Sequence, residues 1–283
     1  MPLLHLVVLA VLQGAAEALP VSPSGHAAAA RLWFSPGAAG PGLEAVLHLA
    51  TALALGIAAR KRLASALGEG VRAIARPMLF QASPGARDAA VLVIASAVSL
   101  GTASLVAPRA ATLRDAPFAT GIGLLVTGVA LASTRWARRG WPGARRGDAP
   151  ATQEAPLLLL AALAGIAHGL AAFPGASRVG AALTVLLWLG VRPSRAAPLA
   201  LAITLPSLLF AAAQGLAHGA ELGGIDPGGL ALGLVVTFLA ALLASGVLIR
   251  LASRRRLPAL ALWIIPLGLA LLAYARALPA SGT

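Results

Sequence analysis

The sequence contains no cysteine, few aromatic residues and few charged ones. Without cysteine, the 283-residue chain forms no disulfide bond and offers no thiolate to a metal ion. Charged residues make up 11% of the chain, whereas a soluble domain carries about 25%. Apolar residues are abundant instead: 59% of the chain is hydrophobic and the mean hydropathy is +0.86. This composition excludes an ordinary soluble domain and indicates an integral membrane protein.

Eight apolar segments approach the ~20 residues that a helix needs to cross a bilayer. They lie at about 3–19, 43–59, 88–107, 117–134, 156–172, 196–217, 229–249 and 259–277. No basic residue precedes the first of them, and it leads directly into Glu17, so we expect no cleavable signal peptide.

The net charge of +13 is concentrated in three of the segments between these apolar runs. We interpret all three as basic loops: one with Arg60, Lys61, Arg62, Arg72, Arg76 and Arg87, one with Arg135, Arg138, Arg139, Arg145 and Arg146, and one with Arg250, Arg254, Arg255 and Arg256. The loops that alternate with them carry little positive charge. This alternation is the positive-inside pattern, which places the three basic loops in the cytoplasm. The charge therefore reports membrane topology, and we expect no nucleic-acid partner.

The same charge pattern determines how segment 156–195 meets the membrane. It begins inside, after the basic loop at 135–155. The 229–249 span ends inside, at Arg250, so the 196–217 span before it must begin inside. Segment 156–195 thus ends on the side where it began. We therefore predict a re-entrant hairpin with Pro174-Gly175 near its tip. Segment 1–42 resembles it, which favours a second hairpin that enters from the opposite side.

These arguments predict an all-α polytopic membrane protein with six transmembrane helices and two opposed re-entrant hairpins in an inverted repeat. We expect a single domain over 1–283, with halves at about 1–134 and 156–283 joined by a basic cytoplasmic loop at 135–155. Inverted repeats with broken helices bring two such hairpins together near the middle of the membrane.

Two short polar islands interrupt the apolar chain, at 13–26 and at 168–180. Each begins with an amide or imidazole side chain followed by glycine, and each passes through a proline to a turn rich in serine and glycine. The first island carries Glu17 and His26, and the second carries Ser177 and Arg178. Ionisable groups at membrane depth are costly and mark functional sites. We therefore predict that the islands form one site for an anionic group.

The residue types in the islands suit phosphoryl transfer. Arg178 supplies a permanent charge with a fork that matches phosphate oxygens, and helix ends rich in Gly and Ser bring backbone N–H groups close to a phosphate. His26 is suited to general acid–base catalysis, and Glu17 to orienting it, activating water or holding a divalent cation. The predicted catalytic residues are Glu17, Ser24, His26 and Arg178. The predicted substrate-binding residues are Gln13, Ser22, Gly25, Gly175, Ser177, Arg178 and Gly180.

A structural role remains open for each of these side chains. Glu17 could bond a hairpin amide, His26 could cap the turn, and Arg178 could clamp carbonyls of the opposing hairpin. Ser22 and Ser24 are as compatible with turn positions as with nucleophiles. Trp263 falls near a predicted span end, where tryptophan commonly anchors a helix at the membrane interface.

The motifs of both islands resemble those of undecaprenyl-pyrophosphate phosphatases. Residues 17–26, EALPVSPSGH, resemble the pattern E-x-L-P-[VI]-S-S-[ST]-G-H, and residues 174–182, PGASRVGAA, resemble P-G-x-S-R-S-G-x-T. The resemblance extends through the whole chain. It implies a metal-assisted phosphatase of the bacterial cytoplasmic (inner) membrane, with a site that opens outward. The implied substrate is undecaprenyl pyrophosphate, the implied product is the carrier lipid of peptidoglycan synthesis, and the implied cofactor is Mg²⁺ or Ca²⁺, with Glu17 as ligand. The oligomeric state stays open, a homodimer included.

The chain departs from these patterns at four positions. Gln13 stands where the resemblance implies a second Glu, and Pro23 where it implies the middle Ser of the first motif. In the second motif, Val179 replaces a Ser and Ala182 replaces a Thr. These departures leave three functions open: a phosphatase, a transporter or flippase for a polyprenyl phosphate, and a catalytically silent lipid-binding paralogue.

Overall fold

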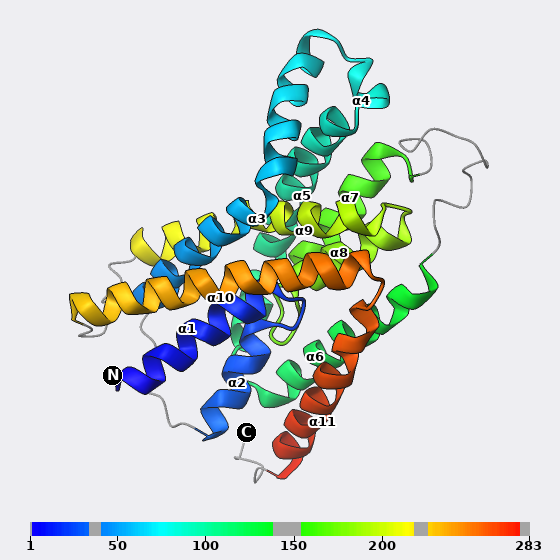
Figure 1. Ribbon diagram of the computed structural model, residues 1–283. Helices are drawn as coiled ribbons and strands as arrows, with labels where there is room; N and C mark the ends of the chain where they lie inside the picture. Colours follow the sequence, from blue (N-terminus) through cyan, green and yellow to red (C-terminus); the bar gives the residue numbers. More distant parts are fainter. Residues whose placement is uncertain (1, 34–40, 138–153, 218–225, 278–283) are drawn as a thin grey trace.

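A computed structural model describes residues 2–33, 41–137, 154–217 and 226–277 of the chain, and every regular element in these ranges is a helix (Figure 1). Most of the basic loop predicted at 135–155, including Arg138, Arg139, Arg145 and Arg146, lies outside the described residues. The α-helices are α1 (Leu3–Ala18), α2 (Pro23–Trp33), α3 (Pro41–Ala75), α4 (Leu79–Ala82), α5 (Pro84–Thr112), α6 (Pro117–Ser133), α7 (Leu157–Leu170), α8 (Arg178–Trp188), α9 (Pro193–Ala217), α10 (Pro227–Ser253) and α11 (Ala261–Ala277). Two short 3₁₀ turns, Thr134–Trp136 and Leu257–Leu260, follow α6 and precede α11.

Six of the helical segments are long and apolar enough to cross a membrane, as the sequence predicts. They are Gly42–Ala75, Pro84–Thr112, Pro117–Trp136, Pro193–Ala217, Pro227–Ser253 and Leu257–Ala277. The two polar islands lie where shorter helices meet, α1 with α2 and α7 with α8, and three of these, α1, α7 and α8, are apolar. This confirms an all-α membrane protein with six long apolar helices. That the short helices enter and leave the membrane on one side stays a prediction.

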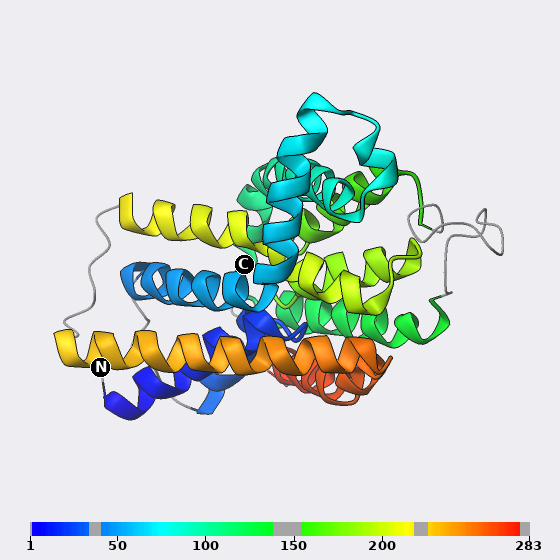
Figure 2. The ribbon, with the colours of Figure 1, turned by 45° about the horizontal axis from the view of Figure 1, so that its top comes forward.

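The first of the three predicted basic loops is largely helical. The interpretation of residues 60–87 as a loop was wrong: α3 continues to Ala75 and α5 begins at Pro84. The hydropathy falls at Arg60, but the Ala, Leu, Arg and Lys residues that follow favour a helix, and no proline interrupts it before Pro77. At 35 residues, α3 is about 50 Å long, well beyond the ~30 Å hydrocarbon core. Figures 1 and 2 show the ends of α3 and α5 projecting from the body with α4 between them.

The largest helix interfaces pair elements of the two predicted halves. Helix α1 packs on α10 and α7 packs on α5, while α3 packs on α9 and α6 on α11. The ends of α3, α9 and α10 lie side by side in Figure 2. This exchange of partners between the halves agrees with an inverted repeat, which itself stays a prediction. The main core lies between these helices and includes Leu55, Leu183, Leu186, Leu199 and Leu248.

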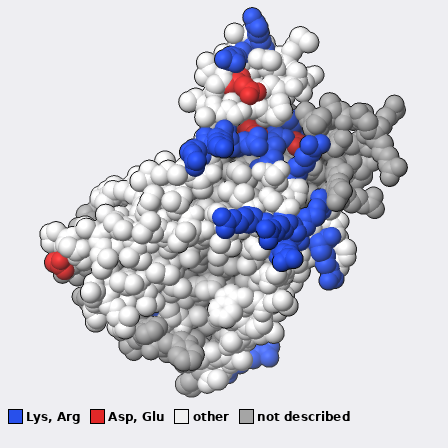
Figure 3. All heavy atoms as spheres, viewed as in Figure 1, with Lys and Arg blue, Asp and Glu red and all other residues white. Residues whose placement is uncertain are grey.

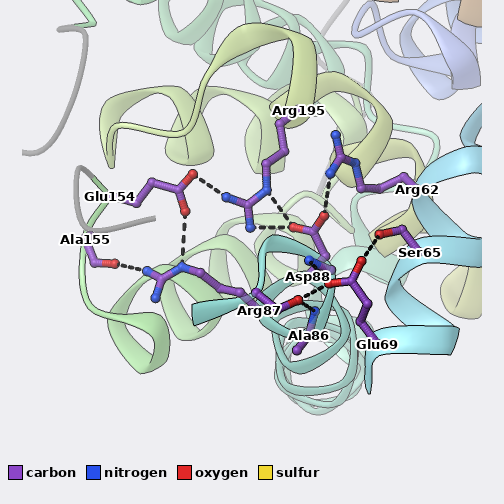
Figure 4. A network of polar contacts seen from close by, with 11 residues as sticks. Arg62, Ser65, Glu69, Ala86, Arg87, Asp88, Glu154, Ala155 and Arg195 are labelled. Carbon is purple, nitrogen blue, oxygen red and sulfur yellow. Dashed lines mark hydrogen bonds and ion pairs between the residues drawn. The ribbon is translucent and has the colours of Figure 1, made fainter. Parts of the chain in front are cut away.

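A buried ion-pair network joins the halves near the base of the projecting helices (Figure 4). Arg195 on α9 bonds Asp88 on α5 at 2.5 Å and also pairs with Glu154. Asp88 is fully buried and accepts a second contact, at 3.0 Å, from Arg62 on α3. Glu154 is in turn held by Arg87 at 3.2 Å. Because each carboxylate contacts two arginines, the network fixes α3, α5 and α9 relative to the start of α7. Lys and Arg gather over this side of the surface (Figure 3).

Candidate active site

The two islands form turns of matching local geometry. In the first, the Ser22 Oγ accepts a hydrogen bond of 3.1 Å from the Gly25 N–H at the start of α2. In the second, the Ser177 Oγ accepts a hydrogen bond of 3.1 Å from the Gly180 N–H at the start of α8. Serine favours this position because its side chain satisfies a backbone donor that the helix leaves unpaired. The predicted phosphate-binding amides of Gly25 and Gly180 are therefore occupied by the serines that cap their own helices.

Each turn contains one buried residue with a positive φ, and the two residues are of different types. Ser22 is completely buried and has φ +70°, a region that non-glycine residues seldom occupy. Gly175 has φ +78° at the tip of the second turn, and a Cβ there would collide with the Thr120 carbonyl of α6. Only glycine fits this position, because it both adopts positive φ without strain and lets the backbone touch α6. The tip lies where Pro174-Gly175 was predicted.

Thr127 of α6, which the sequence did not single out, fastens this second turn. Its Oγ1 accepts a 3.0 Å hydrogen bond from the Ser177 N–H. Nothing in the sequence around Thr127 marks it, because it lies in an apolar span and its partner is 50 residues away. The second turn is thus held rigidly by backbone and hydroxyl contacts.

The structure brings the two islands into direct contact. The Ser24 Oγ accepts a hydrogen bond of 3.0 Å from the Gly175 N–H. Arg178 donates to the Glu17 carboxylate at 3.3 Å across 161 residues of sequence. Glu17 is almost fully buried, whereas the Arg178 side chain keeps 25% of its surface exposed. A guanidinium has five N–H donors, so Arg178 neutralises the buried carboxylate and still presents donors to an anion.

The three predicted serines are not equally available. Ser22 and Ser177 are both buried and act as caps, whereas Ser24 is exposed. The Ser24 hydroxyl lies 3.2 Å from that of Ser22, and within the described part of the chain no imidazole or carboxylate bonds it. Ser24 is therefore the one hydroxyl of the three that faces outward, although no general base contacts it.

His26 has partners at both ring nitrogens. Its Nδ1 lies 2.9 Å from the Ser22 carbonyl oxygen, and its Nε2 lies 2.9 Å from the indole nitrogen of Trp263 on α11. Sequence reasoning gave Trp263 only a membrane-anchoring role. The partnership joins residues 237 apart, which no local pattern reports.

Gln13 lies one helical turn before Glu17 on α1, so both side chains are on the same face of the helix. Its amide nitrogen is buried and has no hydrogen-bond partner. Buried amide donors without a partner are rare in folded proteins. Gln13 is therefore available to donate to a bound group.

His48 of α3 also belongs to the surroundings of the site. Its Nδ1 lies 2.7 Å from the carbonyl oxygen of Glu44 in its own helix, and the charges of Glu17 and Arg178 both act on the ring. It is partly buried. Its Nδ1 hydrogen bond is therefore within α3, and the site residues act on the ring through their charges.

The substituted motif positions have mainly structural surroundings. Pro23 is the first residue of α2, where proline is favoured because its missing N–H would have no partner in the helix. Val179 and Ala182 are buried in the main hydrophobic core. Neither side chain can donate a hydrogen bond to a bound group.

The described residues contain no group of three or more His, Asp or Glu side chains arranged to hold a metal ion. Glu17 is the one carboxylate in the contact between the islands. Mg²⁺ is commonly bound through one or two carboxylates with substrate phosphates completing the shell. The donor set thus fits a divalent cation only if the substrate supplies most of the ligands.

Comparison with known proteins identifies the family to which this chain belongs. The family described as "Bacitracin resistance protein BacA" matches residues 6–270, so the chain belongs to this family. An undecaprenyl-diphosphatase of Maricaulis maris is 32% identical, over 97% of this chain and 99% of its own length. One from Treponema denticola is 26% identical over 97% and 98%, and undecaprenyl-diphosphatase 2 of Frankia casuarinae is 31% identical over 93% and 91%.

Proposed function

We propose that this protein hydrolyses undecaprenyl pyrophosphate to undecaprenyl phosphate and inorganic phosphate, which recycles the carrier lipid for peptidoglycan synthesis. The observation that carries the proposal is the contact between the islands, where the Glu17–Arg178 ion pair lies beside the Ser24–Gly175 hydrogen bond. The family membership and the names of the relatives support the same reaction.

The site would bind the pyrophosphate through side-chain donors. Arg178 is charged and partly exposed, and the unpaired amide of Gln13 lies one turn from Glu17 on α1. The backbone amides of Gly25 and Gly180 are already bonded to serines, so recognition would rely less on helix-end N–H groups than the sequence suggests. Preorganised donors of this kind lower the barrier by stabilising charge that develops on the transferred phosphoryl group.

We favour water as the nucleophile. Ser24 is exposed, but neither His26 nor Glu17 bonds its hydroxyl, and a serine nucleophile needs an adjacent base. In this reaction a base at the site, His26 or Glu17, takes a proton from water as the water oxygen bonds the terminal phosphorus. The bond to the bridging oxygen breaks, and undecaprenyl phosphate leaves with that oxygen. Ser24 would then orient Gly175 and a phosphate oxygen.

A divalent cation, Mg²⁺ or Ca²⁺, is part of the proposal. Glu17 would hold it together with pyrophosphate oxygens, and the ion would neutralise charge on the leaving group. If Arg178 released Glu17 and bonded the substrate instead, the Glu17 carboxylate would be available for this contact.

We place the protein in the bacterial inner membrane with the site open to the outer side, as the family resemblance implies, and with the basic loops in the cytoplasm, as the charge pattern predicts. The six long apolar helices establish that it is a multi-pass membrane protein. The orientation and the number of subunits, including a homodimer, remain proposals that reporter fusions at residues 145 and 222 and size measurements in detergent would test.

The test is phosphate release from undecaprenyl pyrophosphate by purified protein, with and without EDTA. Glu17→Gln should reduce release by about 100-fold or more, as loss of a general base or metal ligand does. Asp226→Asn is the matched control, because it removes a carboxylate that only caps α10 and should keep full activity. Folded protein that binds the lipid but releases no phosphate would instead support a carrier or a silent paralogue.

Ser24→Ala separates the two nucleophiles. If water attacks, the variant should keep activity within about tenfold of the original, because a lost hydrogen bond costs about 1 kcal/mol. Abolished turnover, together with an acid-stable phosphorylated protein that forms only when Ser24 is present, would establish Ser24 as the nucleophile and refute water attack.

A further inference from the structure

The partners of His26 determine which of its nitrogens carries the proton. The indole nitrogen of Trp263 is a donor only, so the His26 Nε2, 2.9 Å away, must be the acceptor. The proton of the neutral ring is then on Nδ1, which donates to the Ser22 carbonyl at 2.9 Å. The two contacts together define a neutral imidazole with its basic nitrogen directed at α11.

The relative position of the two rings agrees with this bond. Their planes differ by 23° and their centroids are 6.3 Å apart. Because the Nε2 lone pair lies in the plane of the imidazole, a nearly coplanar, edge-to-edge arrangement lets the indole N–H point along it. Face-to-face stacking would bring the centroids closer. The indole therefore contacts His26 mainly through its N–H.

Each contact constrains a different motion of the imidazole. Ser22 is completely buried, and its carbonyl oxygen also accepts a hydrogen bond of 3.2 Å from the His26 backbone N–H, so the acceptor is fixed in place. This bond alone would leave the ring free to swing about the Nδ1–oxygen axis. Trp263 comes from α11, on the opposite side of the ring, and removes that freedom.

We propose that Trp263 is a positioning residue for His26, on the condition that the reaction proposed above takes place. Its N–H selects the tautomer with Nε2 unprotonated and holds the plane of the ring. This bond sets the orientation of the ring in the resting site, and because Nε2 has one lone pair, it breaks when a water or phosphate proton arrives. Catalysis depends on such orientation, since small misplacements of a catalytic group cost large factors in rate.

A plain membrane anchor is the competing explanation for Trp263. Its side chain is 60% exposed, and interfacial tryptophans are common in membrane proteins. An anchor or a contact to the prenyl chain would act on lipid binding, independently of His26. A positioning residue would act on turnover and only through His26.

The experiment is a double-mutant cycle with Trp263→Phe and His26→Ala, which keeps an aromatic ring at 263 and removes only its N–H donor and indole shape. We expect Trp263→Phe to lower kcat by about fivefold to tenfold, with KM changed less than about twofold. The effect should be equal for undecaprenyl and farnesyl pyrophosphate. In the His26→Ala background, Trp263→Phe should change the residual rate by less than about twofold.

Two results would overturn the positioning role. One is a double variant whose kcat is reduced by the product of the two single reductions. The other is an effect of Trp263→Phe confined to KM for the longer substrate. Trp136→Phe is the matched control, because that tryptophan is equally exposed but contacts Arg135 instead, and it should leave kcat unchanged.

A spectroscopic measurement tests the bond without turnover. The indole ¹H–¹⁵N signal that disappears in Trp263→Phe identifies Trp263, and it should shift in His26→Ala. An unshifted signal would refute the bond. An inactive original protein would refute the proposed function, whereas an active one that needs His26 but tolerates Trp263→Phe would refute only the positioning role.

Discussion

The two island hairpins have the same local construction but differ in whether their buried polar side chains have hydrogen-bond partners. Gln13 and His168 hold corresponding positions, each followed by a glycine that lets the backbone approach a neighbouring helix, at Thr237 for Gly14 and at Ser99 for Gly169. They differ in what their side chains find there.

Both ring nitrogens of His168 have a hydrogen-bond partner. Its Nδ1 lies 2.7 Å from the Ser99 hydroxyl and its Nε2 lies 3.1 Å from the Thr204 hydroxyl. The Gln13 amide nitrogen has no partner, and the corresponding hydroxyl, that of Thr237, donates to the Ala10 carbonyl. The comparison suggests that one hairpin is completed by the fold, whereas the other leaves a donor for a ligand. Three substitutions test this difference between the hairpins.

The largest effect is expected at Arg178, the one Lys, Arg, Asp or Glu residue of the second island, 168–180. Arg178→Ala should lower kcat/KM by a factor of about 100 to 1,000, because it removes the main charge that stabilises the transferred phosphate. Phosphate release by protein of verified fold measures this. Arg31→Ala is the control, since its pair with Asp115 is exposed; activity retained in Arg178→Ala would show that the guanidinium is only a clamp on Glu17.

A smaller effect, on stability, is expected at His168. His168→Leu should lower the free energy of unfolding by about 1–3 kcal/mol, because it removes the partner of the buried Ser99 hydroxyl and a bond to Thr204. Thermal unfolding in detergent measures the change. Activity per folded molecule should be preserved; a selective loss of turnover would mean that the second hairpin also takes part in the chemistry.

The smallest effect is expected at Gln13. Gln13→Leu should lower kcat/KM by about tenfold, the value of one hydrogen bond of about 1.4 kcal/mol to a charged group. Its thermal stability should not fall, because the lost amide nitrogen has no partner in the protein. If Gln13→Leu instead destabilised the protein without loss of activity, Gln13 would serve the fold of the first hairpin and not a ligand.

Much of the site follows from local sequence. The islands at 13–26 and 168–180 identify Glu17, Arg178 and the turn at Pro174-Gly175, because proline, glycine and ionisable residues are conspicuous in an apolar chain. The caps formed by Ser22 and Ser177 follow the ordinary preference of helix starts. The identity of the exposed serine does not follow, since Ser22 and Ser24 are equally polar and differ only in how α2 packs.

The helical continuation of α3 shows where hydropathy misleads. The drop in hydropathy at Arg60 marks where the apolar run ends, but backbone propensity continues the helix to Ala75. The ion pairs of Asp88 and Glu154 could not be predicted either. They join α3, α5, α9 and the start of α7, and charge counting records only that basic residues gather on one side.

The membrane class, the six long apolar helices and the residues of the two islands could be predicted from the sequence alone, because hydropathy, proline and capping act over a few residues. Which side chains bond one another depends on the tertiary structure. Glu17 meets Arg178 across 161 residues and His26 meets Trp263 across 237, while Gln13 is left without a partner. Hydrogen bonds depend on distances of about 3 Å, and between remote segments the packing of helices alone sets such distances.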